Sequence, residues 1–315
     1  MFIRNLAIAL SAMAGAACAQ NQPALAQTVE PFAIYSPAGY TLAGDIQYPD
    51  HIAGNLPAII LVSGSGPQDR HAGLGDTGYS AHRQWREIFN AAGFAVITFD
   101  ETGMGETGGE WAEMGLAEHR DNALAAVNHA RADGRINADR VFALGHSEGG
   151  MIISMMSAAD PEIAGLVYAA GPGADLNEVI EYQTAAMARA MIEDESEFEA
   201  AQAQARERFM GMLNSAASLR DGLTYSPLDL ARQVNAPAII LQGEHDWQVL
   251  AEQAPALAEA LGTTGQPVEM HVFPDVNHLL IHDPSHSQDY RELTDFDLDP
   301  RLTASAVAWL TRQAG

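Results

Sequence analysis

A glycine-flanked serine stands between two regular elements of the sequence. Gly145-His146-Ser147-Glu148-Gly149 has the pattern Gly-x-Ser-x-Gly; it follows the apolar run Val141 to Leu144 and precedes a helical pattern. This combination is typical of a nucleophile elbow, where glycines are needed because other side chains would collide in so tight a turn. The pattern alone arises by chance in many proteins, but its flanking elements favour an elbow over a plain glycine-rich helix start. We therefore predict that Ser147 is a nucleophile.

A serine at neutral pH is a weak nucleophile and needs a base that is itself oriented by an acid. After an elbow, these partners follow in the chain order Ser, Asp, His. Asp246 comes soon after the apolar run 238–241, and His278 follows the predicted strand 268–273. Both therefore stand in loops that leave predicted strands. The sequence predicts a triad of Ser147, Asp246 and His278.

Glu244 and Asp275 are rival acids near the same two strands, but each fits the register less well than Asp246. A histidine in a loop often has a structural role, and the chain has 11 histidines. The position of His278 in the last strand-to-helix loop is what favours it as the base.

Acyl transfer also requires two backbone N–H donors for the oxyanion, one from the residue after the nucleophile and one from the loop after the third strand. Glu148 is the residue after the serine. The second donor is expected in Ser63-Gly64-Ser65-Gly66-Pro67, which follows a predicted strand and has two glycines that let the chain bend. We predict Ser65 and Glu148 as the donors. The alternative is that the glycine-rich segment is only a flexible turn.

Apolar runs and helical patterns alternate along the chain and position these residues. The predicted strands are 32–35, 41–48, 58–62, 95–99, 140–144, 165–169, 238–241 and 268–273, and the predicted helices are 81–92, 116–132, 148–158, 249–261 and 302–312. Such alternation indicates an α/β fold with a mostly parallel sheet and helices on both faces.

One block interrupts the alternation. Residues 173–235 contain no convincing strand, and their apolar residues recur every three or four positions, as in amphipathic helices. We expect a helical cap insertion over 173–235, within a core made of 27–172 and 236–315.

The first 26 residues have the layout of a secretory signal peptide, with Arg4 ahead of an apolar stretch and small residues at two cleavage sites, after Ala19 or after Ala26. The stretch of about 12 apolar residues is too short to cross a bilayer core that needs roughly 20. We expect a soluble protein exported to the periplasm or secreted. Cys18 leaves open a lipid-anchored alternative, although Gly15 stands where a lipoprotein signal usually has Leu. Because Cys18 is the only cysteine, the mature chain would have no disulfide.

The charge of the chain excludes other classes of function. Asp and Glu number 41 against 16 Lys and Arg, which leaves a formal charge of -25 and disfavours nucleic acid as a partner. All the basic residues are Arg, so a P-loop, a Schiff base and a Ser-Lys dyad are excluded.

Three other patterns are weak. Gly103-Met104-Gly105-Glu106-Thr107-Gly108 matches a dinucleotide fingerprint but lacks the helix and second strand that it needs. His278, His282 and His286 are spaced as on one helical face, but Pro284 interrupts that face. Asp295, Asp297 and Asp299 begin like a calcium loop, but Pro300 and Ala306 stand where Gly and Glu are required. We expect no metal and no cofactor.

Three segments together resemble the α/β-hydrolases, and more narrowly the bacterial esterases with a Gly-Ser-Gly-Pro-x-Asp-Arg loop. They are Gly64-Ser65-Gly66-Pro67-Gln68-Asp69-Arg70, Gly145-His146-Ser147-Glu148-Gly149-Gly150 and Leu241 to Val249. The resemblance covers nearly all of the mature chain and implies the α/β-hydrolase fold, with the triad and oxyanion donors given above. Two departures, His71 in place of a second Asp and Glu101-Thr102 in place of an Arg, put the ion pairs of these loops in question.

The sequence thus predicts an exported serine esterase that acts on a small-molecule ester without a cofactor. One alternative is a cap-bearing serine peptidase that removes N-terminal residues, with Glu178 or Glu181 holding the substrate's ammonium. Another is a catalytically silent binding protein that keeps the fold. The natural substrate, the acyl length and the oligomeric state are left open.

Overall fold

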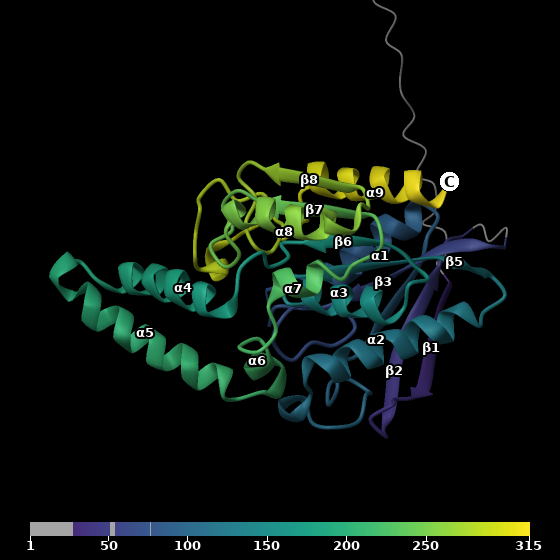
Figure 1. Ribbon diagram of the computed structural model, residues 1–315, viewed down its shortest axis with the longest axis horizontal. Helices are drawn as coiled ribbons and strands as arrows, with labels where there is room; N and C mark the ends of the chain where they lie inside the picture. The colour runs from purple at the N-terminus through teal and green to yellow at the C-terminus, as the bar shows by residue number, and fades with distance from the viewer. Residues whose placement is uncertain (1–27, 51–53, 76) are drawn as a thin grey trace, which may run out of the picture.

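The protein is built around one eight-stranded sheet (Figure 1). The computed structural model describes residues 28–50, 54–75 and 77–315. Its strands are β1 (Thr28–Tyr35), β2 (Thr41–Tyr48), β3 (Leu56–Val62), β4 (Ala95–Phe99), β5 (Ile136–His146), β6 (Ile163–Ala169), β7 (Ala238–Gly243) and β8 (Val268–Phe273). They lie in the order β1-β2-β4-β3-β5-β6-β7-β8; β2 is antiparallel to both β1 and β4, and the other pairs are parallel.

Helices cover both faces of this sheet. The first face carries α1 (Ala81–Ala91) and α9 (Pro300–Ala314), and the second carries α2 (Leu116–Arg131), α3 (Gly149–Ala159), α7 (Pro227–Ala231) and α8 (Ala254–Leu261). In β3, Ile59 and Leu61 pack toward α1 and α9, whereas Ile60 and Val62 pack toward the second face. Because successive strand residues alternate in direction, an apolar run with no polar gap is buried on both sides. The predicted fold class is confirmed.

Three elements differ from their predicted bounds by four residues or more. β1 begins at Thr28 rather than Phe32. β5 begins at Ile136 rather than Arg140, because Ile136 pairs with Leu56 across polar residues that the apolar pattern does not reveal. α8 begins at Ala254, after a short 3-10 turn at Ala251–Gln253, rather than at Val249. The N–H groups of Gln248 and Val249 instead donate to the carboxylate of Asp246, which holds this part of the chain as a loop.

The described residues between β6 and β7 contain no strand. They form α4 (Leu176–Met191), α5 (Phe198–Leu213), α6 (Ala217–Asp221) and α7. α4 and α5 pair and project from the body of the molecule, as Figure 1 shows, and they share a small cluster that includes Ile180 and Phe209. α7 by contrast packs in the main core on the second face of the sheet. The part of the block that leaves the sheet is therefore α4 to α6, and the division into core and cap stays a prediction.

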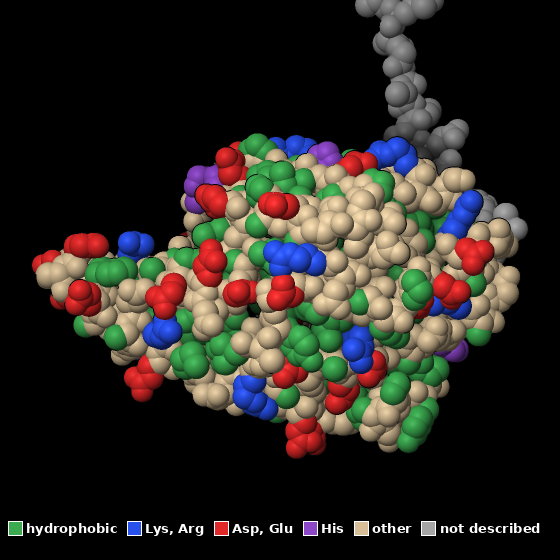
Figure 2. Space-filling view, in the orientation of Figure 1, with side chains coloured by type: hydrophobic (Ala, Val, Ile, Leu, Met, Phe, Trp, Pro, Cys, Tyr) green, Lys and Arg blue, Asp and Glu red, His purple; other side chains and the backbone are tan. Residues whose placement is uncertain are grey.

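Acidic side chains are spread over the visible face and along the projecting helices (Figure 2). In the part of the chain that is described, no helix is both long and apolar enough to cross a membrane. The predicted signal peptide, both cleavage sites and Cys18 lie outside the described residues.

Candidate active site

Ser147 lies in a sharp turn between β5 and α3. Its φ is 54°, a left-handed conformation that is uncommon for a non-glycine residue, and its N–H donates to the carbonyl of Ala169 at 3.0 Å. A Cβ on Gly145 would lie 2.2 Å from the carbonyl oxygen of Gly149, and a Cβ on Gly149 would lie 2.5 Å from that of Val62. Both glycines are therefore required for the turn, as the elbow pattern predicts.

Asp246 and His278 meet at the carboxyl ends of β7 and β8. The Nδ1 of His278 lies 2.8 Å from Oδ2 of Asp246, and both side chains are buried. The two loops lie close because β7 ends in Gly243, where a Cβ would be 2.3 Å from the carbonyl oxygen of Val276. The N–H of His245 also donates to that carbonyl at 3.0 Å, which continues the pairing of the strands into the loops.

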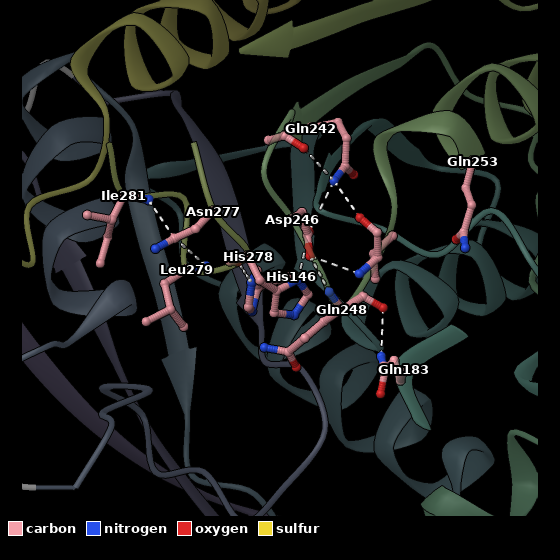
Figure 3. Close-up of polar contacts among 12 residues, drawn as sticks. His146, Gln183, Gln242, Asp246, Gln248, Gln253, Asn277, His278, Leu279 and Ile281 are labelled. Atoms are coloured by element: carbon pink, nitrogen blue, oxygen red, sulfur yellow. Dashed lines mark hydrogen bonds and ion pairs between the residues drawn. The ribbon is translucent and has the colours of Figure 1, made fainter. Parts of the chain in front are cut away.

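The carboxylate of Asp246 accepts from three further donors, as Figure 3 shows. Oδ1 accepts from the N–H groups of Gln248 and Val249, both at 2.8 Å, while Oδ2 also accepts from Nε2 of Gln242 at 3.0 Å. Four donors therefore satisfy this buried carboxylate, which fixes its orientation toward His278. Gln242 was missed in the sequence, where a glutamine at the end of an apolar strand carries no distinctive signal.

Four of the five predicted site residues line one cavity of about 540 Å³: Ser65, Ser147, Glu148 and His278. Asp246 lies behind His278, and its side chain has no exposed surface. Of the rival acids, Glu244 is exposed and Asp275 instead lies beside two other histidines. The structure therefore places Asp246, and neither rival, against the imidazole of His278.

The segment after β3 approaches the serine closely. A Cβ on Gly64 would lie 2.9 Å from the Cβ of Ser147, so a larger residue would displace this loop. Next to it, the hydroxyl of Ser65 donates to Oε2 of Glu148 at 3.1 Å. Burial raises the pKa of the Glu148 carboxyl to about 7. The two residues predicted as oxyanion donors are thus linked through their side chains.

Arg70 anchors the other end of this loop. Its Nε and Nη2 donate to the two carboxylate oxygens of Asp100 at 3.0 and 2.6 Å, and it also pairs with Asp45 and Glu106, both at 2.8 Å. Fork-shaped bidentate pairing of this kind is strong and directional. The ion pairs of this loop are therefore present despite the two sequence departures.

At the two departures themselves, the chain makes other contacts. Glu101 is buried, and burial raises the pKa of its carboxyl well above the usual range. It accepts from the N–H of Gln68 at 3.2 Å. The N–H of His71 donates to the side chain of Asp69 at 2.9 Å.

His146, inside the elbow motif, supports the histidine loop. Its Nε2 lies 2.8 Å from the carbonyl oxygen of His278, and because a carbonyl only accepts, Nε2 must carry the proton. Burial lowers the pKa of His146 to about 4, so the ring is neutral. Asn277 holds the same loop by accepting from the N–H of Leu279 at 3.0 Å (Figure 3). His82, buried and on the cavity wall, is a further residue that the sequence analysis missed.

Comparison with known proteins gives the chain a family. The family model "Prolyl oligopeptidase family" matches residues 80–299, more than half of the chain. Esterase EstD of Thermotoga maritima is 26% identical over 284 residues, which cover 86% of this chain and 66% of EstD. Dipeptidyl-peptidase 5 of Porphyromonas gingivalis is 27% identical over 233 residues, which cover 71% of this chain and 31% of that protein. The chain thus spans about two thirds and about one third of these relatives.

Solved structures show the fold. An α/β-hydrolase from a Penicillium species, GrgF, superposes with a TM-score of 0.62 at 16% identity, over 91% of this chain and 99% of that one. The sheet order, the helical layers and the elbow agree with this likeness, and the protein has the α/β-hydrolase fold. By its sequence, the chain belongs to the prolyl oligopeptidase family.

Proposed function

We propose that the protein is a serine hydrolase that cleaves carboxylic esters. The observation that carries this proposal is the contact of 2.8 Å between His278 and Asp246 beside a cavity that is also lined by the elbow serine. A buried carboxylate on Nδ1 leaves Nε2 of His278 as the nitrogen available to a serine hydroxyl. These are the parts that an acyl-transfer reaction needs.

In the proposed reaction, Nε2 of His278 takes the proton of Ser147 as its Oγ attacks the ester carbonyl. The N–H groups of Ser65 and Glu148 donate to the oxygen that becomes negative. His278 then returns the proton to the leaving alcohol, and an acyl-Ser147 intermediate remains. Water, deprotonated by the same imidazole, attacks this intermediate, and the acid and free Ser147 are released. Asp246 holds the imidazole and stabilises its positive charge.

The cavity wall supports an ester with an apolar acyl group. Its lining includes Trp85, Leu144, Val179, Phe209 and Leu213, whereas Glu148 is the one carboxylate among the lining residues that are described. Burial raises the pKa of this carboxyl to about 7. EstD, a curated relative, is named an esterase.

A serine peptidase is the second candidate, and it is favoured by the family and by the relative named dipeptidyl-peptidase 5. The acids considered for holding an N-terminal ammonium do not support it. Glu178 is exposed and outside the cavity lining, and Glu181 pairs with Arg206 on the surface of the projecting helices. Aminoacyl anilides tested beside acyl esters separate the two functions; faster hydrolysis of the anilides would replace our proposal with a peptidase.

Labelling with a fluorophosphonate tests whether the site is catalytic at all. We expect the wild-type protein to be labelled at Ser147 and the Ser147→Ala variant to be inert, because only a base-activated serine reacts at useful rates. Ser65→Ala is the matched control, since it removes a neighbouring hydroxyl and keeps the backbone donor. Labelling at another residue, or none in a folded wild-type protein, would leave the silent binding protein as the better description.

The proposal includes export, which rests on the pattern of the first 26 residues. A cleaved and exported protein should begin at Gln20 or Gln27. N-terminal sequencing of the protein recovered outside the cytoplasm checks this expectation, and an intact Met1 there would contradict it.

A further inference from the structure

Two histidines and an aspartate converge beside the proposed triad without taking part in it. Nδ1 of His245 lies 3.6 Å from Oδ1 of Asp275, and Nε2 of His286 lies 3.6 Å from the same oxygen. All three atoms lie within 4.8 Å of one another. Figure 2 shows histidine side chains beside acidic ones at the edge of the molecule near the ends of β7 and β8.

This spacing fits a metal ion. Zinc holds nitrogen and oxygen ligands at about 2.0–2.1 Å in a tetrahedron, which places neighbouring ligand atoms about 3.3–3.4 Å apart. The two measured separations of 3.6 Å exceed this value by a few tenths of an ångström. The third pair of ligand atoms lies within 4.8 Å, so side-chain rotations are needed to bring all three atoms onto one ion.

The imidazoles of His245 and His286 lie directly against each other, with ring centroids 3.3 Å apart. In addition, Nδ1 of His245 is buried and has no hydrogen-bond partner. A buried ring nitrogen without a partner is costly. A shared cation would satisfy this nitrogen.

The type of ligand atom selects the type of ion. Imidazole nitrogen suits zinc and the neighbouring transition metals, while magnesium and calcium prefer sites made of oxygen alone.

The backbone of the loop after β8 is left-handed at two of these residues. The φ angles of Asp275 and His286 are 59° and 56°. Asp283 links them, since its N–H donates to the carbonyl of Asp275 at 2.6 Å and its own carbonyl accepts from the N–H of His286 at 3.4 Å.

We propose that His245, Asp275 and His286 bind a divalent transition-metal ion of the zinc class, with water completing its coordination. His245 directly precedes Asp246, and Asp275 lies in the same loop as His278. The ion would thus fasten the loop that carries the acid to the loop that carries the base. The metal has no part in the hydrolytic steps, and this site differs from the expectation of no metal that the sequence supported.

The test uses Zn²⁺ alone as the probe. Untagged full-length protein is stripped with a chelator and titrated by calorimetry against a competing chelator. We expect one ion per chain with a dissociation constant of micromolar or below. His286→Ala and Asp275→Asn should weaken binding by more than the 10- to 100-fold that loss of an outer-shell partner typically costs. His271→Ala is the matched control, because this histidine is exposed on β8 and lies 3.7 Å from Glu269, outside the cluster.

A second readout depends on folding rather than on activity. At about 100 times its dissociation constant, Zn²⁺ should raise the melting temperature by roughly 5 °C in the wild type and in His271→Ala. It should leave His286→Ala unchanged. Because the side chain of His286 is 54% exposed, this variant is expected to fold, and its circular dichroism confirms that before titration.

Either of two results would overturn the proposal. If folded wild-type protein binds no zinc, or if His286→Ala and His271→Ala weaken binding equally, the three residues are a surface cluster only. All measurements are made without substrate and are repeated on Ser147→Ala. Failure of this site is therefore distinct from failure of the proposed hydrolase.

Discussion

The two carboxylate oxygens of Asp246 have different partners, one on His278 and one on the backbone. Oδ2 contacts His278, while Oδ1 is held by two N–H groups of its own loop. In Asp246→Asn, the amide can place its NH₂ group toward Nδ1, which favours the wrong imidazole tautomer. We expect kcat for an ester substrate to fall by about 10⁴, as it does in another serine-hydrolase triad.

Glu244→Gln is the matched control for this residue, because Glu244 is exposed two positions away in the same loop. It should retain nearly wild-type turnover. Near-wild-type kcat in Asp246→Asn together with a collapse in Glu244→Gln would show that the acid has been assigned wrongly.

The loop after β3 and the elbow are joined by the contact between Ser65 and Glu148. The pKa of Glu148 is raised from 4.5 to about 7, so the carboxyl ionises as the pH rises through 7. A negative charge beside a developing oxyanion opposes the reaction. We expect kcat/KM of Glu148→Gln relative to wild type to rise from pH 6 to pH 8 by roughly threefold or more.

The same shift has a consequence for stability. Since the folded protein holds this proton more tightly than the unfolded chain, the free energy of unfolding of the wild type falls relative to Glu148→Gln as the pH rises from about 4.5 to 7. Parallel pH–rate profiles and denaturant titrations of the two proteins measure both effects. If the ratio of kcat/KM between Glu148→Gln and wild type stays constant from pH 6 to pH 8, the charge of Glu148 does not affect the reacting oxygen.

The projecting helices and the sheet domain both contribute residues to the cavity lining. α4 is tied to the acid loop by Gln183, whose Nε2 donates to the carbonyl of Gln248 at 2.7 Å, and α5 contributes Phe209 and Met212 to the lining. The acyl group of an ester is therefore expected to lie between the two parts. Longer acyl chains would then contact α5.

Met212→Ala tests this arrangement. We expect kcat/KM for an octanoate ester to fall by about threefold or more, with little change for an acetate ester, because about 0.8 kcal/mol is lost for each methylene no longer buried. Met191→Ala is a close control: both methionines are 48% exposed, but Met191 is outside the cavity lining. Equal effects of the two variants on both esters would remove the projecting helices from substrate binding.

Local patterns of the sequence determined much of the fold. The bounds of β2 and β4 agree with the predicted strands, because buried strands contain runs of alternating or continuous apolar residues. The bounds of β8 agree as well, although only Phe273 of this strand is buried. The elbow could also be predicted from the sequence, because most atoms that require glycine in this turn lie within a few residues of Ser147. The carbonyl of Val62 is an exception. The early start of β5 could not be predicted from the apolar pattern, because backbone pairing can continue through polar residues.

The contacts between distant side chains follow from long-range packing. The register favoured Asp246 over Glu244, but no local pattern shows that Asp246 contacts His278, that Arg70 pairs with Asp45, or that His245 lies against His286. These contacts depend on the strand order and on the register between β7 and β8, which set how the loops emerge at one edge of the sheet. The sequence thus determined the fold class and the order of the candidate triad residues, whereas long-range packing decided their partners, because side-chain contacts between loops are not encoded in the periodicity of either loop.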